Sequence, residues 1–352
     1  MNQPKQQNLQ QQIQKPQNSQ NSQQTQQTQK PQNSQQQTQK PQNSQQQTQQ
    51  TQKPQNIFQF VSNNKSTNHL NQVNQVNHVN IICKKVCLFT NARDEKHIRE
   101  WAAHHLLIGF DKIIIFDHKS KIPLTKVFEN FDKRVKIINV SYLDTSIKIN
   151  LMNKASEIAN ILNMDWMIYL DADEFIILNK FKGIKQLLSV YNHADSLGVN
   201  WLFFGSNHLK TDPDGLILEN YTKSELCLND HLKSFVRPSK IIRPGNPHFY
   251  FIKDSNRYFG VNNKNITTLH HSNDYQVEYH KSPIYIAHYV NQSEETFTKR
   301  KLILPRDDNG EHRQMNHIEE IHNQFNSNEN NDPKNKYAEK VKQFLKQYGH
   351  EF

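Results

Sequence analysis

Three carboxylates follow directly on an apolar run near the middle of the chain. The carboxylates are Asp171, Asp173 and Glu174, and apolar runs lie on either side, at 166–170 and 175–178. An unpaired charge in the middle of a buried strand costs several kcal/mol, of order ~5 or more. The pattern therefore predicts a core strand that ends with the first apolar run and delivers its carboxylates to the edge of a sheet.

The chemistry that these residue types predict is the binding of a hard divalent cation. In an extended segment the side chains of Asp171 and Asp173 point to the same side, so they can share one ion. Open α/β sheets bind ligands at the carboxyl ends of their strands. Glu174 points the other way, and we expect it to be a structural partner to an arginine or a backbone amide. The alternative is an acidic turn without a ligand.

Strand and helix patterns alternate on the way to this segment. Short β-rich runs occupy 86–90, 112–117 and 135–140, and helical spacing of apolar residues covers 98–106 and about 150–162. This alternation predicts βαβ units, right-handed crossovers and a mainly parallel, Rossmann-like sheet. Polar residues follow three of the strands, at 91–95, at Asp117 and at 171–174. A ligand site at the carboxyl edge of the sheet is therefore expected.

The chain lacks a glycine-rich loop for phosphate. It contains neither G-x-G-x-x-G nor G-x-x-x-x-G-K-[ST], and it has only nine glycines. A nucleotide bound here would need a cation and basic side chains to neutralise its diphosphate. Mg²⁺ or Mn²⁺ held by carboxylates and substrate phosphates is the expected arrangement.

The second half of the chain shows less regular patterns. Strand-like runs occupy 199–206, 231–238, 241–245 and 284–289, and 335–348 has the pattern of an amphipathic surface helix. His288 falls in the last of these strands. A histidine in an apolar strand is more often a hydrogen-bonded core residue than a ligand.

Composition divides the chain into a tail and a folded part. Residues 1–80 are rich in Gln and Asn, contain six lysines and no acid, and repeat one decapeptide at 30–39 and 40–49. Such a segment buries too little apolar surface to offset its chain entropy, so we predict a disordered, solvated spacer and no nucleic-acid partner. The folded part covers roughly 81–352, which we divide into a main domain over 81–305 and a helical extension over 306–352.

Cysteine usage and hydropathy bear on the compartment. Three cysteines, Cys83, Cys87 and Cys227, make no disulfide framework, and the first two are expected to be buried thiols in a strand. No apolar signal core and no run of 18 apolar residues is present. These features predict a cytoplasmic protein.

Several motifs, in order, resemble glycosyltransferases of the family-2-like and family-92-like type. The D-x-D-E-F motif of that group matches 171–175 letter for letter, and the resemblance runs from about Val86 to Lys301. The other matching segments are Asn91-Ala92-Arg93-Asp94-Glu95 with Glu100-Trp101-x-x-His104-His105, Trp201-x-x-Phe204-Gly205, Lys233-Ser234-x-x-Arg237-Pro238 and the stretch after His288. One acid of the pattern is missing, because Lys121 stands in its place.

The resemblance implies a single glycosyltransferase A-type domain, a nucleotide-sugar donor and a Mn²⁺ or Mg²⁺ cofactor. We expect the donor to be a UDP-sugar. It implies a hexosyltransferase that acts on a hydroxyl of a glycan, protein or lipid. Carried over by position, the metal ligands are Asp171 and Asp173, with His288 as a third group on the metal side or the phosphate side. The nucleoside contacts are Arg93, Glu95 and Asp117, and the residues facing phosphate or acceptor are Lys233 and Arg237. A structural salt bridge is the alternative for the last two.

An inverting mechanism also needs a carboxylate base to take the proton of the acceptor hydroxyl. Asp212 and Asp230 are the candidates, with Asp214 and Asp254 not separated from them, and a retaining mechanism needs none of the four in this role. Two other functions stay open. One is a nucleotidyltransferase, and the other is a degenerate transferase-like domain that serves as a binding module.

Overall fold

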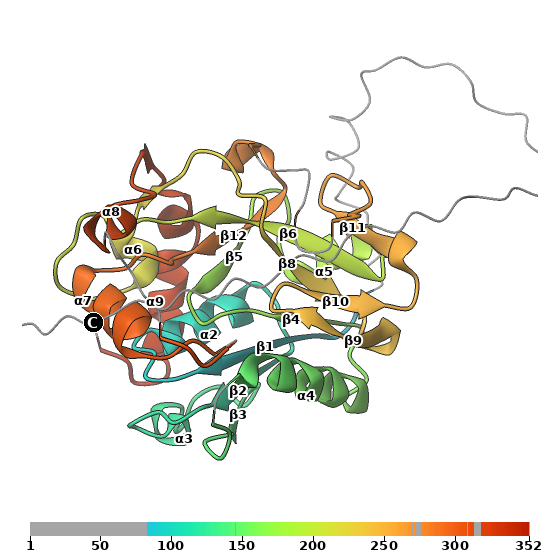
Figure 1. The fold of residues 1–352 in the computed structure, drawn as a ribbon, viewed down its shortest axis with the longest axis horizontal. Helices are drawn as coiled ribbons and strands as arrows, with labels where there is room; N and C mark the ends of the chain where they lie inside the picture. The colour runs from blue at the N-terminus through green and yellow to red at the C-terminus, as the bar shows by residue number, and fades with distance from the viewer. Residues whose placement is uncertain are drawn as a thin grey trace, which may run out of the picture. The chain divides into compact units, whose positions relative to one another are not determined.

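A nine-stranded sheet forms the centre of the fold (Figure 1). The computed structural model describes residues 83–144, 146–268, 271, 276–307, 309–312 and 318–351. The predicted disordered tail over 1–80 lies outside the described residues. The first half alternates as expected, in the order β1 (Val86–Ala92), α2 (Ile98–Leu107), β2 (Lys112–Asp117), α3 (Leu124–Val127), β3 (Val135–Asn139), α4 (Ile147–Ile161) and β4 (Trp166–Tyr169).

The second half begins with a strand on the far side of the acidic motif. It contains β5 (Glu174–Leu178), α5 (Ile184–Val190), β6 (Ser196–Phe203), α6 (Ile217–Asn220), β7 (Lys223–Ser224), β8 (Leu232–Val236), η2 (Pro238–Lys240), β9 (Ile241–Asn246), β10 (Phe249–Ile252), η3 (Ser255–Arg257), β11 (Tyr258–Gly260), η4 (Tyr279–Lys281) and β12 (Ile284–His288). The C-terminal elements are α7 (Glu294–Phe297), η5 (Thr298–Ile303), α8 (Ile318–His322), β13 (Asn328–Glu329), η6 (Lys334–Ala338) and α9 (Glu339–Lys346).

The sheet is mixed, so the prediction of a mainly parallel sheet is wrong. Its order is β3-β2-β1-β4-β8-β6-β12-β5, with β11 beside β6. The first four strands are parallel, but β8 runs antiparallel to both β4 and β6, and β5 runs antiparallel to β12. Parallel neighbours need a crossover of about a dozen residues or more, and the connections from β1 to β2 and from β2 to β3 are longer than that. The connection from β6 to β8 is longer still, so its length permits either direction, and the local pattern of apolar residues does not specify one.

The sheet is curled because β4 and β5 are close in sequence and far apart in the strand order. Four strand intervals separate them, which is ~19 Å in a flat sheet. The chain from Tyr169 to Glu174 spans at most ~18 Å when fully extended. It is not extended, because the amide of Glu174 donates to the carbonyl of Asp171 at 3.1 Å and closes a turn. The sheet must therefore curl to bring β5 back toward β4.

Side chains, not a neighbouring strand, satisfy the outer edge of β5. Trp101 Nε1 donates to the carbonyl of Glu174 at 2.8 Å, and His104 Nε2 donates to the carbonyl of Ile176 at 2.8 Å. His105 Nε2 accepts from the amide of Ile176 at 3.4 Å while its Nδ1 donates to the carbonyl of Trp101. The tryptophan and histidines of α2 therefore belong to the architecture of the sheet, since an unpaired buried backbone group is costly.

Two apolar clusters lie on the two faces of the sheet. Alternate residues of β1 divide between them: Leu88 packs on the side of α2 and α5, and Phe89 packs on the side of α4. The predicted amphipathic C-terminal helix is present as η6 followed by α9, which buries Val341 and Leu345. Cys83 and Cys87 are buried free thiols, as predicted, but only Cys87 lies in a strand, because β1 begins at Val86.

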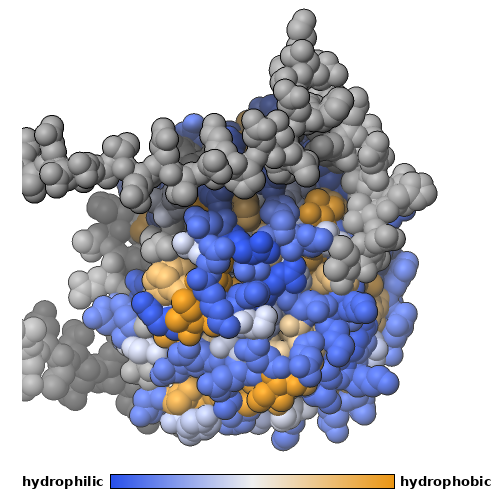
Figure 2. Space-filling view, turned by 90° about the vertical axis from the view of Figure 1, so that its right-hand side faces the viewer, coloured by the Kyte–Doolittle hydropathy of each residue, from blue (hydrophilic) through white to orange (hydrophobic). Residues whose placement is uncertain are grey.

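One face of the molecule is largely polar. On the face shown in Figure 2, hydrophilic residues predominate and hydrophobic residues form small separate patches. Among the described residues, no helix combines the length and apolar character needed to cross a membrane.

We predict that His104 makes folding pH-dependent. Burial lowers its pKa from 6.5 to about 4, so the unfolded chain binds a proton that the folded chain does not. The stability that depends on neutral His104 is present above pH 6.5 and is lost as the pH falls toward 4, by about 3 kcal/mol. His104→Gln keeps an N–H donor for Ile176 but does not titrate.

The measurement is the free energy of unfolding in urea at pH 7, 5.5 and 4. The wild-type protein should lose more stability over this range than His104→Gln. Other buried histidines titrate in both proteins, so the difference between the two slopes isolates His104. Equal slopes would contradict the assignment.

Candidate functional site

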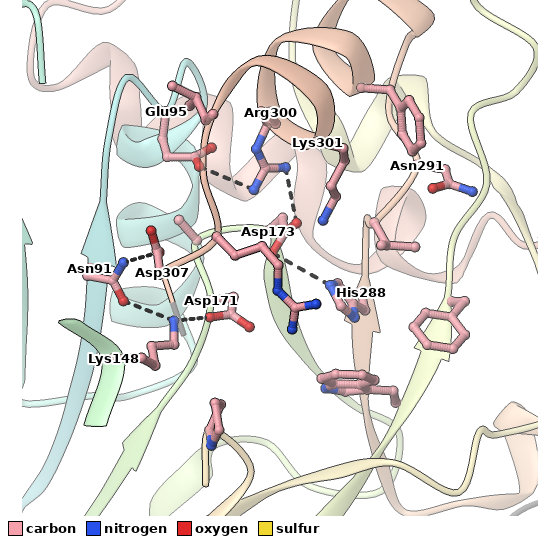
Figure 3. A pocket seen from close by; sticks show the side chains of 18 of the residues that line it. Asn91, Glu95, Lys148, Asp171, Asp173, His288, Asn291, Arg300, Lys301 and Asp307 are labelled. Atoms are coloured by element: carbon pink, nitrogen blue, oxygen red, sulfur yellow. Dashed lines mark hydrogen bonds and ion pairs between the residues drawn. The ribbon is translucent and has the colours of Figure 1, made fainter. Parts of the chain in front are cut away.

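A cavity of about 510 Å³ opens at the carboxyl ends of β1 and β4 (Figure 3). The acidic turn forms its floor, the ends of β6 and β12 form one wall, and the segment from α7 through residue 307 forms another. Its charged and aromatic lining comprises Arg93, Glu95, Lys148, Asp171, Asp173, Trp201, Phe203, Lys233, His248, His288, Phe297, Arg300, Lys301, Arg306, Asp307 and Phe325. The parallel pairing of β1 with β4 brings the residues that follow both strands to this one edge.

Two lysines bind the carboxylate of Asp171 from different parts of the chain. Lys148 Nζ of α4 donates to Oδ1, and Lys233 Nζ of β8 donates to Oδ2 at 2.9 Å. Burial favours the neutral acid, but the two ammonium groups outweigh it and hold the pKa of Asp171 well below its ordinary value. The lowered pKa keeps this carboxylate ionised. Because 31% of the Asp171 side chain is exposed, the carboxylate is also open to the cavity.

Lys148 also joins the acidic turn to β1. Its ammonium donates to Asn91 Oδ1 at 2.9 Å, and the hydroxyl of Tyr169 donates to the same oxygen at 3.1 Å. Asn91 Nδ2 in turn donates to Asp307 Oδ2 at 2.6 Å. This network connects both strand ends to the segment that closes the cavity.

Asp173 lies deeper and has different partners. Arg300 Nη1 of η5 lies 3.0 Å from its Oδ2, and His288 Nε2 of β12 lies 3.7 Å from its Oδ1. Burial opposes ionisation, but Arg300 and His288 lower the pKa of Asp173 to about 2. Arg300 also pairs with Glu95 at 3.2 Å. Burial raises the pKa of Glu95, although Arg300 counteracts it.

Glu174 points away from the cavity and supports the turn. Its Oε2 accepts from the backbone amide of Asp171 at 2.9 Å, and the Lys233 ammonium lies 3.5 Å from Oε1. Of the two partners expected for it, an arginine or a backbone amide, the structure has the amide. Burial raises the pKa of Glu174 well above its ordinary value.

The residue types at this site suit a divalent cation, although the ligand atoms of Asp171, Asp173 and His288 do not all lie within 4.8 Å of one another in this structure. Asp171 and Asp173 supply ionised oxygens to one cavity, and His288 lines the same cavity. The Nδ1 atom of His288 is buried and has no hydrogen-bond partner among the described residues. Burial lowers the pKa of His288 to about 4, so its imidazole is neutral at pH 7, the form that binds metals.

The predicted nucleoside and phosphate contacts separate into two groups. Arg93, Glu95 and Lys233 line the cavity. Asp117 does not, because its carboxylate accepts from the amides of Ser120 and Leu124 and so holds the loop after β2. Arg237 also lies elsewhere.

The side chain of Arg237 has a structural role, which was the alternative to a phosphate or acceptor contact. Its guanidinium stacks over Trp166 at 4.4 Å and donates to the carbonyls of Ala194 and Asn192 at 2.9 Å. It fastens the loop before β6 to the sheet.

The four candidate bases all lie outside the cavity lining. Asp212 pairs with Lys96 at 2.9 Å, and burial is outweighed by His97 and Lys96, which hold its pKa below the ordinary value. Asp254 caps η3, and Asp214 is on an exposed loop. Asp230 contacts two histidines on the outer side of the Trp201 wall.

Five charged residues of the cavity lining were given no role from the sequence, namely Lys148, Arg300, Lys301, Arg306 and Asp307. A signal for Lys148 was available, since it lies three and four residues before Leu151 and Met152 on the buried face of α4. A lysine in an apolar stripe indicates a buried acidic partner. Arg300 and Asp307 come from a segment without periodicity, and only the fold brings them to the cavity.

We predict that Arg300→Gln destabilises the protein by about 3 kcal/mol at pH 7, because it leaves Asp173 and Glu95 without their shared cation. Since Arg300 lowers the pKa of Asp173, its contribution is full above pH 4 and fades as the pH falls from about 4 to 2. Lys299→Gln is the matched control, because Lys299 pairs with Glu295 on the surface. Urea unfolding at pH 7 should leave the control within about 0.5 kcal/mol of wild type. Equal losses in both variants would refute the pairing.

No protein-family model matches the chain. Among curated proteins, it is 26% identical over 220 residues to a glycosyltransferase family 92 protein of Ricinus communis, a match that covers 58% of this chain and 39% of that protein. The chain thus spans about two fifths of the length of this relative. The distant match supports a relationship to glycosyltransferases.

Solved structures give weaker comparisons. A nucleotidyl transferase from Methanothermobacter thermautotroptrophicus is 7% identical with a TM-score of 0.25, covering 44% of this chain and 73% of that one. A UDP-glucose pyrophosphorylase complexed with UDP-glucose is 11% identical with a TM-score of 0.24, covering 44% and 69%. A cytidylyltransferase from Leptospira borgpetersenii is 12% identical with a TM-score of 0.22, covering 33% and 52%. TM-scores this low support no conclusion about fold or function.

Proposed function

We propose that this chain is a metal-dependent glycosyltransferase that moves a sugar from a UDP-linked donor to a hydroxyl acceptor. The observation that carries the proposal is the cavity itself. Asp171 and Asp173 line it, and six basic side chains stand against four acidic ones. A site with an excess of positive charge and a carboxylate pair suits a diphosphate that arrives with a cation. The distant glycosyltransferase match supports sugar transfer in general.

Asp171, Asp173 and His288 are the residues that we propose to hold Mn²⁺ or Mg²⁺. When bound, the cation neutralises charge on the donor diphosphate and on the nucleoside diphosphate that leaves. Asp173 directly precedes β5, and His288 is the last residue of β12. Because these two strands pair antiparallel, their pairing fixes the separation of the two residues.

The basic side chains have a second role in the proposal. Lys148 and Lys233 lie on Asp171, and Arg300 lies on Asp173. These cations can donate to phosphate oxygens from where they stand, because each has more N–H groups than its carboxylate partner uses. Held in place before the donor binds, they stabilise the charge that develops as the glycosidic bond breaks. Arg93 and Glu95 are the proposed nucleoside contacts.

The apolar wall of the cavity is the proposed contact for flat ring faces. Trp201 and Phe203 lie with ring centroids 5.5 Å apart, and Phe325 stacks on Phe203 at 4.7 Å. Aromatic faces of this kind pack against sugar rings and bases. The acceptor is a glycan, a protein or a lipid, and its class depends on which of these molecules can contact the aromatic wall.

A binding module without catalysis is the second candidate. The observation that favours it is that both aspartates already have cationic partners, so their charges are balanced without a metal. Lys121, which stands where the family pattern has an acid, points the same way.

We predict that Asp173→Asn abolishes catalysis while the fold persists. The purified protein with Mn²⁺ and a panel of UDP- and GDP-sugars should release nucleoside diphosphate, and the variant should be slower by at least ~100-fold. It should also lose the rise in melting temperature that Mn²⁺ and a nucleotide sugar together give the wild-type protein. Asp254→Asn is the control, since Asp254 only caps η3 and asparagine is an equally good cap. Donor binding without release of nucleoside diphosphate by the wild-type protein would favour the binding module.

A further inference from the structure

A second group of metal-binding side chains lies outside the cavity. Asp230, His231 and His271 each offer a ligand atom, and these atoms lie within 4.8 Å of one another. Asp230 and His231 come directly before β8, and His271 is 40 residues later in sequence. An isolated antiparallel bridge joins the backbones of the two histidines, so the approach of their rings is fixed by the fold.

The carboxylate of Asp230 lies between the two imidazoles. Its Oδ1 is 3.0 Å from His231 Nδ1, and its Oδ2 is 3.0 Å from His271 Nδ1. The ring centroids of the histidines are 4.7 Å apart. Ligands of a tetrahedral zinc ion lie ~2.0–2.2 Å from the metal and hence about 3.3 Å from one another. Each histidine nitrogen is therefore near that spacing from the carboxylate, and the three ligand atoms all lie within 4.8 Å of one another.

We propose that Asp230, His231 and His271 form a zinc site that is separate from the cavity. Two imidazoles and one carboxylate are a donor set for Zn²⁺, whereas the oxygen-rich pair Asp171 and Asp173 suits Mn²⁺ or Mg²⁺. Between a third and two fifths of each of the three side chains is exposed, so an ion can enter from solvent and a water molecule can complete the tetrahedron. The other transition metals that imidazole favours, Ni²⁺ and Cu²⁺, are of the same class.

The site is coupled to the cavity through Trp201. The ring of His231 stacks on Trp201 with centroids 5.5 Å apart and an interplanar angle of 12°. Trp201 lines the cavity, and its ring also lies 4.4 Å from that of His288, centroid to centroid. Lys233, two residues after His231, binds Asp171. An ion that ties His271 to the beginning of β8 thus fixes one wall of the cavity and the strand that carries Lys233.

The experiment is a zinc titration of the full chain after dialysis against a chelator. Isothermal calorimetry, or competition with a chromogenic zinc chelator, should show one strong Zn²⁺ site in the wild-type protein. His231→Ala and His271→Ala should each weaken zinc binding by about 100-fold, and an excess of Mn²⁺ should not displace the zinc. X-ray absorption at the zinc edge should show nitrogen and oxygen neighbours with the scattering pattern of imidazole.

Two controls separate this site from others. His280→Ala removes an exposed histidine that pairs with Glu278 elsewhere on the surface, and Asp173→Asn removes the proposed cavity ligand. Both should bind zinc as the wild-type protein does. Circular dichroism in the presence of chelator should give the two ligand variants the wild-type fold.

The outcomes are decisive in each direction. Zinc binding that survives in both ligand variants and disappears in Asp173→Asn would assign the ion to the cavity and overturn the proposal. Failure of the wild-type protein to bind zinc would do the same. Because the readout is metal binding, neither result depends on whether the chain transfers sugar.

Discussion

The turn between β4 and β5 constrains the rest of the structure. A handful of residues must connect two strands that stand four places apart in the sheet order, and the sheet curls to allow it. The same turn carries Asp171 and Asp173, so the curl and the acidic site have one origin. Glu174 stabilises the turn from behind through the amide of Asp171. A change that straightened this turn would disrupt the sheet and the site together.

The curl leaves β5 at the end of the strand path, with one edge unpaired by any strand. Trp101, His104 and His105 of α2 supply the missing hydrogen bonds, and Tyr337 completes the edge by accepting from the amide of Leu178 at 3.0 Å. Residues of the types that do chemistry elsewhere have a structural role here. Burial lowers the pKa values of both histidines, so they stay neutral at pH 7 and act as fixed donors and acceptors.

Local pattern was enough to predict the first half of the fold. The alternation of apolar runs through β4 identified strands and helices near their observed bounds. Each of these elements buries apolar residues that recur at the spacing of a strand or of a helix, so the local sequence is enough to recognise it. The direction of β8 was not predictable in this way. A strand's pattern shows which face is buried but not which neighbours it joins, and the insertion of β8 between β4 and β6 depends on contacts distant in sequence.

The candidate site was predictable to the same extent. Residue type and spacing singled out the acidic pair, and the resemblance to glycosyltransferases added His288, whereas Lys148 and Arg300 reach the cavity only through tertiary packing. Asp117 had the right residue type at a strand end, but the short loop after β2 uses its carboxylate for two amides. Proximity to a strand end therefore identifies candidates, and the local demand for hydrogen bonds decides which of them stay available to a ligand.

The charge balance of the cavity has a consequence for the proposed function. Asp171 is neutralised by Lys148 and Lys233, so a cation that approaches alone must compete with two ammonium groups. A donor diphosphate brings negative charge that can take over the lysines' hydrogen bonds and release the carboxylate. Each ligand then lowers the cost of binding the other, which is a reciprocal coupling free energy between them. Under the proposed function, the cation and the nucleotide sugar would therefore bind as a pair, and Lys148 and Lys233 would stabilise the Asp171 carboxylate until they do.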